Sequence, residues 1–145
     1  MVGEGTDYAD LIIIDGLDLA VEESSQNPVY YCQYAYARIC SIFRKMEESG
    51  VKLDECCVSA DDLLTQEAEK ELIRFISSLT SETENAAKLL DPSKLTRYAV
   101  ELATLFHKFY NACHVFGVEA DLTMARLALC DAVRIGLHNA LSMMK

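Results

Sequence analysis

The sequence contains few of the residues that interrupt regular structure. It has two prolines, six glycines and no tryptophan among 145 residues. Because glycine and proline mark turns, this scarcity favours long helices over a β-sandwich with many turns. Half of the residues are apolar (51%) and a quarter are charged (25%), which is typical of a globular domain and excludes a chain that is disordered throughout. The length corresponds to a single domain.

No apolar segment is long enough to cross a membrane. The longest aliphatic run is Leu11–Ile14, whereas a spanning helix needs roughly 20 apolar residues. The first residues are acidic and show neither the positive region nor the cleavage site of a secretory signal. We therefore expect a cytoplasmic protein that has no membrane partner.

The cysteines form no Cys-x-x-Cys pair and do not have the spacing of a metal finger. Several of them fall in apolar helical stretches, where cysteine behaves as a small hydrophobic residue. We interpret them as reduced thiols of a cytosolic protein, with a disulfide framework as the alternative. The six positions are 32, 40, 56, 57, 113 and 130.

The charge is negative overall but unevenly distributed. The net charge of −10, from 23 acidic and 13 basic side chains, excludes a uniformly basic nucleic-acid-binding protein. Residues 1–27 carry seven acidic side chains and no Lys or Arg, and residues 47–91 carry twelve acidic and four basic ones. Residues 28–46, in contrast, carry Arg38, Arg44 and Lys45 and no acid. A local basic face therefore remains possible in this segment.

The spacing of the apolar residues predicts helices and no strand. We divide the chain into a lead-in or linker stub at residues 1–15 and a helical domain at residues 16–145. The fold class that follows is all-α, a bundle of about four to six helices. The expected helices span residues 17–25, 28–49, 66–78, 82–90, 92–116 and 122–145, with a connection at residues 51–62.

Capping residues define the expected helix ends. Asn27 can cap the helix that begins at Pro28, because proline suits a position whose N–H has no partner. Gly50 is the expected stop of that helix, and Gly117 is the expected stop of the longest helix. Thr65 and Ser81 are the expected caps of the two helices between them.

The helix at residues 28–49 has two distinct faces. On a helical wheel, Tyr31, Tyr34, Arg38 and Lys45 fall within about 60° of one another. Aromatic rings that stack on bases, beside cations that neutralise phosphate, are the components of a single-stranded nucleic-acid surface. The alternative is an amphipathic helix whose tyrosines only pack against neighbours. The other face is the expected core face: Val29, Cys32, Tyr36, Ile39, Cys40 and Phe43.

The helix at residues 92–116 carries a polar flank beside a long apolar stripe. The flank consists of His107, Tyr110, Asn111 and His114, and is either a recognition surface or a set of hydrogen-bonding residues. A metal site is not expected, because Cys113 points to the core and the spacing matches no common site. The expected core stripe is Leu95, Tyr98, Leu102, Leu105, Phe106, Phe109, Cys113 and Phe116.

No catalytic motif is present. The sequence has no P-loop, and Gly3-x-Gly5 lacks the third glycine of a dinucleotide fingerprint. The serines and cysteines lie in no nucleophile motif, and the Asp61-Asp62 pair lies in a polar stretch. We therefore expect no catalytic residue and no cofactor in this chain.

Several segments resemble one family in the same order along the chain. Residues 27–41, which begin Asn-Pro and continue to Tyr34-Ala-Tyr36-Ala-Arg38, resemble the first helix of the C-terminal anticodon-binding domain of arginyl-tRNA synthetases, which are class I aminoacyl-tRNA synthetases. That family usually reads Asn-Pro-x-x-Tyr-x-Gln-Tyr-Ala-His-Ala-Arg there. The resemblance covers roughly residues 10–144, and its other segments are residues 17–20, 95–98, 106–111, 126–129 and 133–134.

The resemblance implies an all-helical bundle that holds the anticodon loop of the arginine tRNA. By the family's motif, Tyr31, Tyr34 and Arg38 meet the loop, and they are also the residues that the wheel places together. His107, Tyr110 and Asn111 lie in a second family motif and are further candidates, while Lys45 would add distal positive charge. The implied partners are this tRNA and the catalytic domain of the parent synthetase.

The chain also departs from the family. Tyr36 replaces the usual histidine, which we interpret as a change in packing because Tyr36 lies on the core face. The sequence stops at Met144-Lys145, where many members continue with a short tail that closes over the anticodon; the absence of this tail would weaken binding. The nucleotide-binding signatures of a class I catalytic domain are missing. ATP and Mg²⁺ are therefore expected only in the parent enzyme.

Two other functions remain open at this point. The acidic blocks at residues 1–27 and 47–91 could dock a basic protein or the synthetase body, which would make the chain a helical protein-interaction or assembly module without RNA binding. A metal- or thiol-based sensor is the other possibility.

Overall fold

The computed structural model describes residues 27–53 and 60–143, and these ranges contain helices and no strand. The expected all-α bundle is confirmed. The predicted linker stub at residues 1–15 and helix at 17–25 lie outside the described residues. No helix in the described ranges is both long and apolar enough for a membrane span. The elements are α3 (Pro28–Glu48), α4 (Ala60–Leu63), α5 (Glu67–Ser77), α6 (Leu79–Leu89), α7 (Ser93–Ala112) and α8 (Ala120–Ser142).

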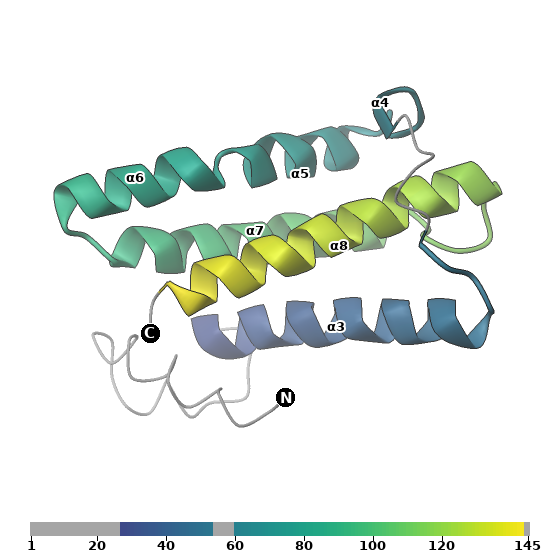
Figure 1. Cartoon of the computed structure of the whole chain (residues 1–145), viewed down its shortest axis with the longest axis horizontal. Helices are drawn as coiled ribbons and strands as arrows, with labels where there is room; N and C mark the ends of the chain where they lie inside the picture. The colour runs from purple at the N-terminus through teal and green to yellow at the C-terminus, as the bar shows by residue number, and fades with distance from the viewer. Residues whose placement is uncertain (1–26, 54–59, 144–145) are drawn as a thin grey trace.

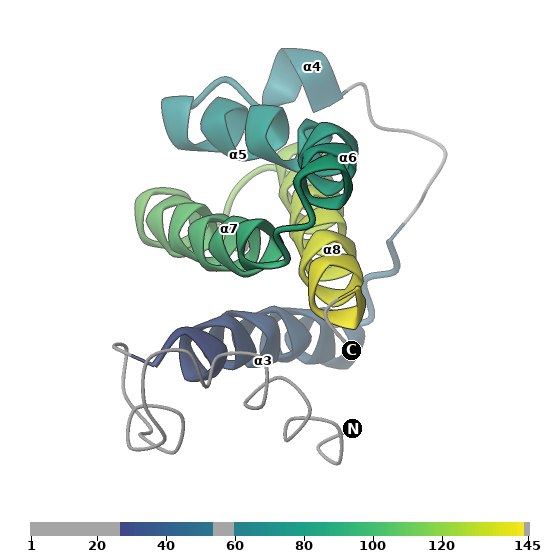
Figure 2. The same ribbon diagram turned by 90° about the vertical axis from the view of Figure 1, so that its left-hand side faces the viewer.

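The helices form three layers, with α7 and α8 between the others (Figure 1 and Figure 2). Helices α5 and α6 lie along one side of this central pair, and α3 lies along the other side (Figure 2). Helix α7 packs against α3, α5, α6 and α8. Helix α8 approaches α7 closely at Gly136, where an added Cβ would lie 3.1 Å from Leu102 Cδ2.

Helix α3 begins and ends where the sequence predicts. The side chain of Asn27 accepts hydrogen bonds from the N–H groups of Val29 (3.0 Å) and Tyr30 (3.4 Å), and Pro28 occupies the first helical position. Gly50 follows the helix with a φ of +72°, a conformation that glycine adopts without strain. The tyrosines, Arg38 and Lys45 of the predicted stripe therefore all lie on one continuous helix, as the helical wheel assumes.

The buried face of α3 is rotated from its expected position. Val29, Cys32 and Ile39 are buried as expected, whereas Tyr36 and the two other expected core residues are only partly buried. The residues that the wheel missed are Ala35, Ile42 and Met46, which are all buried. The rotation brings the core toward the predicted stripe, because α7 packs against that side of α3.

The end of α7 differs from the expectation. The helix stops at Ala112 rather than near residue 116, and Cys113 takes an extended conformation (φ −122°, ψ 125°). The N–H of Cys113 still donates to Phe109 O at 2.8 Å, and the side chains of Cys113 and Val115 are buried. Cys113 therefore joins the core from the segment after the helix. Phe116, expected on the core stripe, lies in the same segment and is partly buried.

Two expected caps are wrong, because each helix begins at a residue other than the one that follows the expected cap. Helix α5 starts after Gln66 rather than Thr65, and the N–H of Gln66 donates to Glu69 Oε2 at 2.9 Å. Helix α6 starts at Leu79, directly after Ser78, so Ser81 lies inside it. The expected connection at residues 51–62 also contains the start of the short α4.

A buried ion pair joins three parts of the chain. Arg126 Nε of α8 donates to Glu69 Oε1 of α5 at 2.6 Å, and the two side chains are 8% and 0% exposed. Arg126 Nη1 also donates to the backbone oxygen of His114 at 2.6 Å. A buried charge is tolerated only with such partners, because its desolvation is costly. Arg126 therefore holds the segment after α7 in place.

Replacing Arg126 by Met leaves the Glu69 carboxylate buried with the N–H of Gln66 and without its cation. We expect the free energy of unfolding to fall by about 3–5 kcal/mol, measured by urea denaturation at neutral pH. The control is Arg74→Met, which removes the pair of Arg74 and Glu67 on the surface, where the side chains are 69% and 70% exposed. This control should cost less than about 1 kcal/mol. Equal, small losses would contradict the role of Arg126.

Candidate nucleic-acid interface

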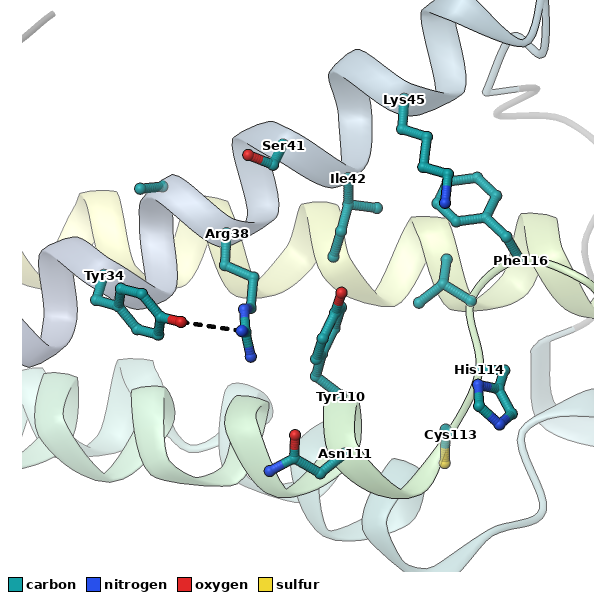
Figure 3. A pocket seen from close by; sticks show the side chains of 12 residues that line it. Tyr34, Arg38, Ser41, Ile42, Lys45, Tyr110, Asn111, Cys113, His114 and Phe116 are labelled. Atoms are coloured by element: carbon teal, nitrogen blue, oxygen red, sulfur yellow. Dashed lines mark hydrogen bonds between the residues drawn. The ribbon is translucent and has the colours of Figure 1, made fainter.

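A groove of about 680 Å³ lies between α3, the end of α7 and the segment that follows α7 (Figure 3). None of the 12 residues that line it is an Asp or Glu, although the chain has 23 acidic side chains. Within the described ranges, no acidic side chain therefore lines this surface. The predicted site residues that the groove brings together are Tyr34, Arg38, Lys45, Tyr110 and Asn111.

Arg38 lies at the centre of these residues. Its Nη2 donates a hydrogen bond to the hydroxyl of Tyr34 at 2.9 Å, and its guanidinium carbon lies 4.5 Å from the centroid of the Tyr110 ring. The same carbon lies 5.1 Å from the centroid of the Tyr34 ring. No carboxylate in the described part of the chain forms a salt bridge with Arg38. Its charge is therefore available to an anion.

The strengths of these contacts indicate which partner Arg38 prefers. An exposed cation–π contact contributes about 0.5–1 kcal/mol. A hydrogen bond to a charged group contributes about 1.5–3 kcal/mol, and guanidinium matches the geometry of phosphate. A phosphate that enters the groove is thus a stronger partner for Arg38 than either ring.

Lys45 extends the positive charge along the groove. It follows Arg38 by seven residues, which is about 10 Å along a helix axis. Its Nζ lies 5.1 Å from the centroid of the Phe116 ring and forms no salt bridge within the described ranges (Figure 3). Phe116 comes from the segment that Arg126 holds. The second cation of the groove is therefore positioned by an aromatic ring rather than by an acid.

A smaller pocket of about 300 Å³ lies beside the groove and is lined by Tyr30, Tyr31, Tyr34, His107 and Asn111. The ring centroids of Tyr31 and Tyr34 lie 5.0 and 5.5 Å from that of His107. Tyr31, which the wheel places with Arg38, thus lines this second pocket and not the groove. Tyr34 and Asn111 line both.

The surroundings of His107 disfavour its protonated form. Burial lowers the pKa of His107 below its usual value, and the positive charge of Arg38 lowers it further. Its Nε2 is buried and has no hydrogen-bond partner within the residues that the structure describes. A buried ring nitrogen of this kind is a potential acceptor or donor for a ligand in the smaller pocket.

The comparisons with known proteins identify the family. The model of the DALR anticodon binding domain family matches residues 32–145. The chain belongs to this family. The arginine–tRNA ligase of Ruminiclostridium cellulolyticum is 47% identical over 128 residues, which are 88% of this chain and 23% of the relative. That of Dehalococcoides mccartyi strain BAV1 is 50% identical over 128 residues, which are 88% of this chain and 22% of the relative.

A solved structure shows the same fold. A crystal structure from Campylobacter jejuni, described as an arginyl-tRNA synthetase, superposes with a TM-score of 0.73 at 26% sequence identity. The match covers 99% of this chain and 32% of that one. This DALR anticodon-binding domain therefore spans less than a quarter of the curated relatives that it matches. The all-α architecture and the family expected from the sequence are both confirmed.

The structure adds residues to the site that sequence reasoning missed. Phe116 and Val115 line the groove because α7 ends early and turns its following segment toward α3. Ala37, Ser41 and Ile42 complete the wall on α3. The helical wheel holds a signal for Ala37 and Ser41, which lie beside the predicted stripe. The sequence holds no such signal for the segment after α7, because the expected helix end at Gly117 lies several residues beyond the actual end at Ala112.

The metal and thiol alternatives find no support at this site. In the described ranges, no group of three or more His, Cys, Asp or Glu side chains could hold a metal ion. The described cysteines, Cys32, Cys40, Cys113 and Cys130, are free, and burial raises the pKa of Cys32 and of Cys130 to about 12. Thiols with such a pKa are poor nucleophiles and poor redox sensors.

Replacing Arg38 by Gln removes the charge that disfavours protonation of His107. We expect the pKa of His107 to rise part of the way toward 6.5, because the burial that also lowers it remains. An NMR titration that follows the imidazole C–H signals of His107 measures this pKa. Arg44→Gln, on the same helix, is the control and should leave the pKa unchanged.

Because the pKa of His107 differs between the folded and unfolded chain, the stability of the fold depends on pH. An unfolded chain binds a proton at His107 first, because the pKa in the folded state is the lower one. The contribution of His107 to stability is therefore complete above the unfolded pKa of about 6.5 and is lost as the pH falls through the folded pKa.

An unchanged His107 pKa in Arg38→Gln would contradict the proximity of these two side chains.

Proposed function

We propose that this domain binds the anticodon loop of arginine tRNA as a module of an arginine–tRNA ligase. The observation that carries the proposal is the acid-free groove in which Tyr34, Arg38 and Tyr110 converge. The curated relatives that are named arginine–tRNA ligases supply the identity of the tRNA. The family that the chain belongs to is described as an anticodon-binding domain.

The groove provides each part of single-stranded RNA recognition. The rings of Tyr34 and Tyr110 are 45% and 36% exposed, and a base that stacks on such a ring gains about 1–3 kcal/mol. Arg38 contacts a phosphate or a base edge, and Lys45 adds distal positive charge. The smaller pocket is lined by Tyr31, Tyr34 and His107, and Asn111 lines both sites.

The module acts by position rather than by chemistry. Holding the anticodon loop places the acceptor end of the tRNA at a catalytic site outside this chain. The catalytic domain of the parent ligase is therefore a partner, and ATP with Mg²⁺ belongs to that domain. This chain alone does not activate arginine. We assign the parent enzyme to the cytoplasm.

The first test is a titration at low salt with two labelled anticodon stem-loops. One carries an arginine anticodon, and the other carries the same bases in scrambled order. We expect tighter binding of the arginine stem-loop, and at least a tenfold loss (about 1.4 kcal/mol) in Tyr34→Ala/Arg38→Ala, which removes a stacking ring and a phosphate contact. Arg44→Ala, outside the groove, is the control.

The competing function predicts a different result. A protein-interaction module would bind both stem-loops equally or not at all, and it would form a stable complex with another protein. RNA affinity that is unchanged in Tyr34→Ala/Arg38→Ala would also reject the groove as the RNA site.

Lys45 contributes charge and no sequence information. We expect Lys45→Ala to weaken both stem-loops by the same factor and to reduce the slope of log K against log salt by about 1. The measurement is the same titration, repeated over a series of salt concentrations. A change in the preference between the two stem-loops would instead assign Lys45 to a base.

A further inference from the structure

The guanidinium of Arg38 covers an aromatic surface that the proposed function needs. Its carbon lies 4.5 Å from the centroid of the Tyr110 ring, which is the distance at which a second planar group stacks. Figure 3 shows the Arg38 side chain extending between the rings of Tyr34 and Tyr110. A base cannot occupy this face of Tyr110 while the guanidinium is there. In the free domain, Arg38 takes the place of a ligand.

The contacts that hold Arg38 in this place are uncharged. They are the hydrogen bond to the Tyr34 hydroxyl at 2.9 Å and the two ring contacts. Arg126, which holds the fold together, is instead paired with a buried carboxylate. Arg38 has no such pair in the part of the chain that the structure describes. A phosphate can therefore draw the guanidinium away from Tyr110.

The groove has space for this exchange. Its volume of about 680 Å³ extends from Tyr34 and Tyr110 to Lys45 and Phe116. Lys45 cannot replace Arg38 in this role, because its Nζ contacts Phe116 and neither tyrosine of the groove. Arg38 is thus the cation whose position decides whether Tyr110 is open.

We propose that Arg38 is a specificity-determining residue that keeps the face of Tyr110 closed until a phosphate draws the guanidinium away. Stacking on Tyr110 then depends on a phosphate next to the base. The site thus favours nucleotides within a strand over free bases and nucleosides. This inference rests on the proposed function, because it concerns how the same groove selects RNA.

The test compares two small ligands that carry the same base. Adenosine has no phosphate, and adenosine 3′,5′-bisphosphate has the phosphates of a nucleotide within a strand. Titration of the chain, followed through the ring signals of Tyr110 by NMR, gives both affinities. For the unaltered chain we expect the bisphosphate to bind at least about tenfold more tightly than adenosine.

Arg38→Ala is the decisive variant. It opens Tyr110, so we expect adenosine to bind about two- to fivefold more tightly, which is the factor for one exposed cation–π contact. The bisphosphate loses its phosphate partner, and its advantage over adenosine should fall below about threefold. Arg44→Ala, on the same helix but outside both pockets, removes an equal charge and should change neither affinity.

Tyr34→Phe tests the same idea without removing a charge. It keeps both rings and Arg38 but removes the hydroxyl that accepts the hydrogen bond from Nη2. Adenosine should bind more tightly than to the unaltered chain but less tightly than to Arg38→Ala, and the advantage of the bisphosphate should remain. Because this change is small, it also keeps the test valid if Arg38→Ala fails to fold.

Affinity for adenosine that is unchanged, weaker or undetectable in Arg38→Ala would overturn the inference, since an arginine that only attracts phosphate has no effect on an uncharged ligand. Equal binding of both ligands by the unaltered chain would overturn it as well. The anticodon stem-loop titration separates this failure from that of the proposed function. A chain that binds the arginine stem-loop but shows no gain for adenosine retains the function and loses only the role of Arg38.

Discussion

One buried guanidinium holds in place the segment after α7, which forms one wall of the groove. Arg126 of α8 contacts Glu69 of α5 and the backbone oxygen of His114, which lies in the non-helical segment between α7 and α8. The desolvation of such a pair is offset only when each group finds its partners, so its geometry tolerates little variation. The position of Phe116, and through it that of Lys45, follows from this constraint.

The charges of this chain differ in the distance over which they act. At physiological salt, exposed charges are screened beyond about 8 Å, so the many acids outside the groove repel a polyanion weakly at its surface. They nevertheless lower the affinity for nucleic acid at every other face of a chain with a net charge of −10. Under the proposed function, Arg38 and Lys45 act by direct contact, on a surface that no described acid lines. Negative charge elsewhere therefore favours selective over indiscriminate RNA binding.

Much of the fold could be predicted from the sequence because local signals determine it. Asn27, Pro28 and Gly50 define α3, and its periodicity places Tyr34 beside Arg38. The rotation of the core toward Ala35 and Ile42 could not be predicted, because it depends on which helix lies next to α3. The end of α7 at Ala112 was missed because burial of Cys113 and Val115, rather than a glycine, determines it.

The candidate site also has features that the sequence predicts and features that depend on how the helices pack. The sequence predicts which side chains face outward, and the resemblance names those that belong to a motif. The contacts of Arg38 with Tyr110, and of Tyr31 with His107, join residues far apart in the chain and exist only once α3 and α7 pack together. A helical wheel treats each helix alone, so it grouped Tyr31 with Arg38, whereas packing places these two side chains in different pockets. The roles of the site residues in RNA binding stay predictions.

Tyr34 forms part of the wall of both pockets, and this shared wall has an energetic consequence. Whatever occupies one pocket sets the position of a ring that shapes the other. The two sites are therefore thermodynamically coupled: if an occupant of the first changes the affinity of the second, the reverse effect has the same size. Under the proposed function, we therefore expect two neighbouring nucleotides to contribute non-additively to the binding free energy.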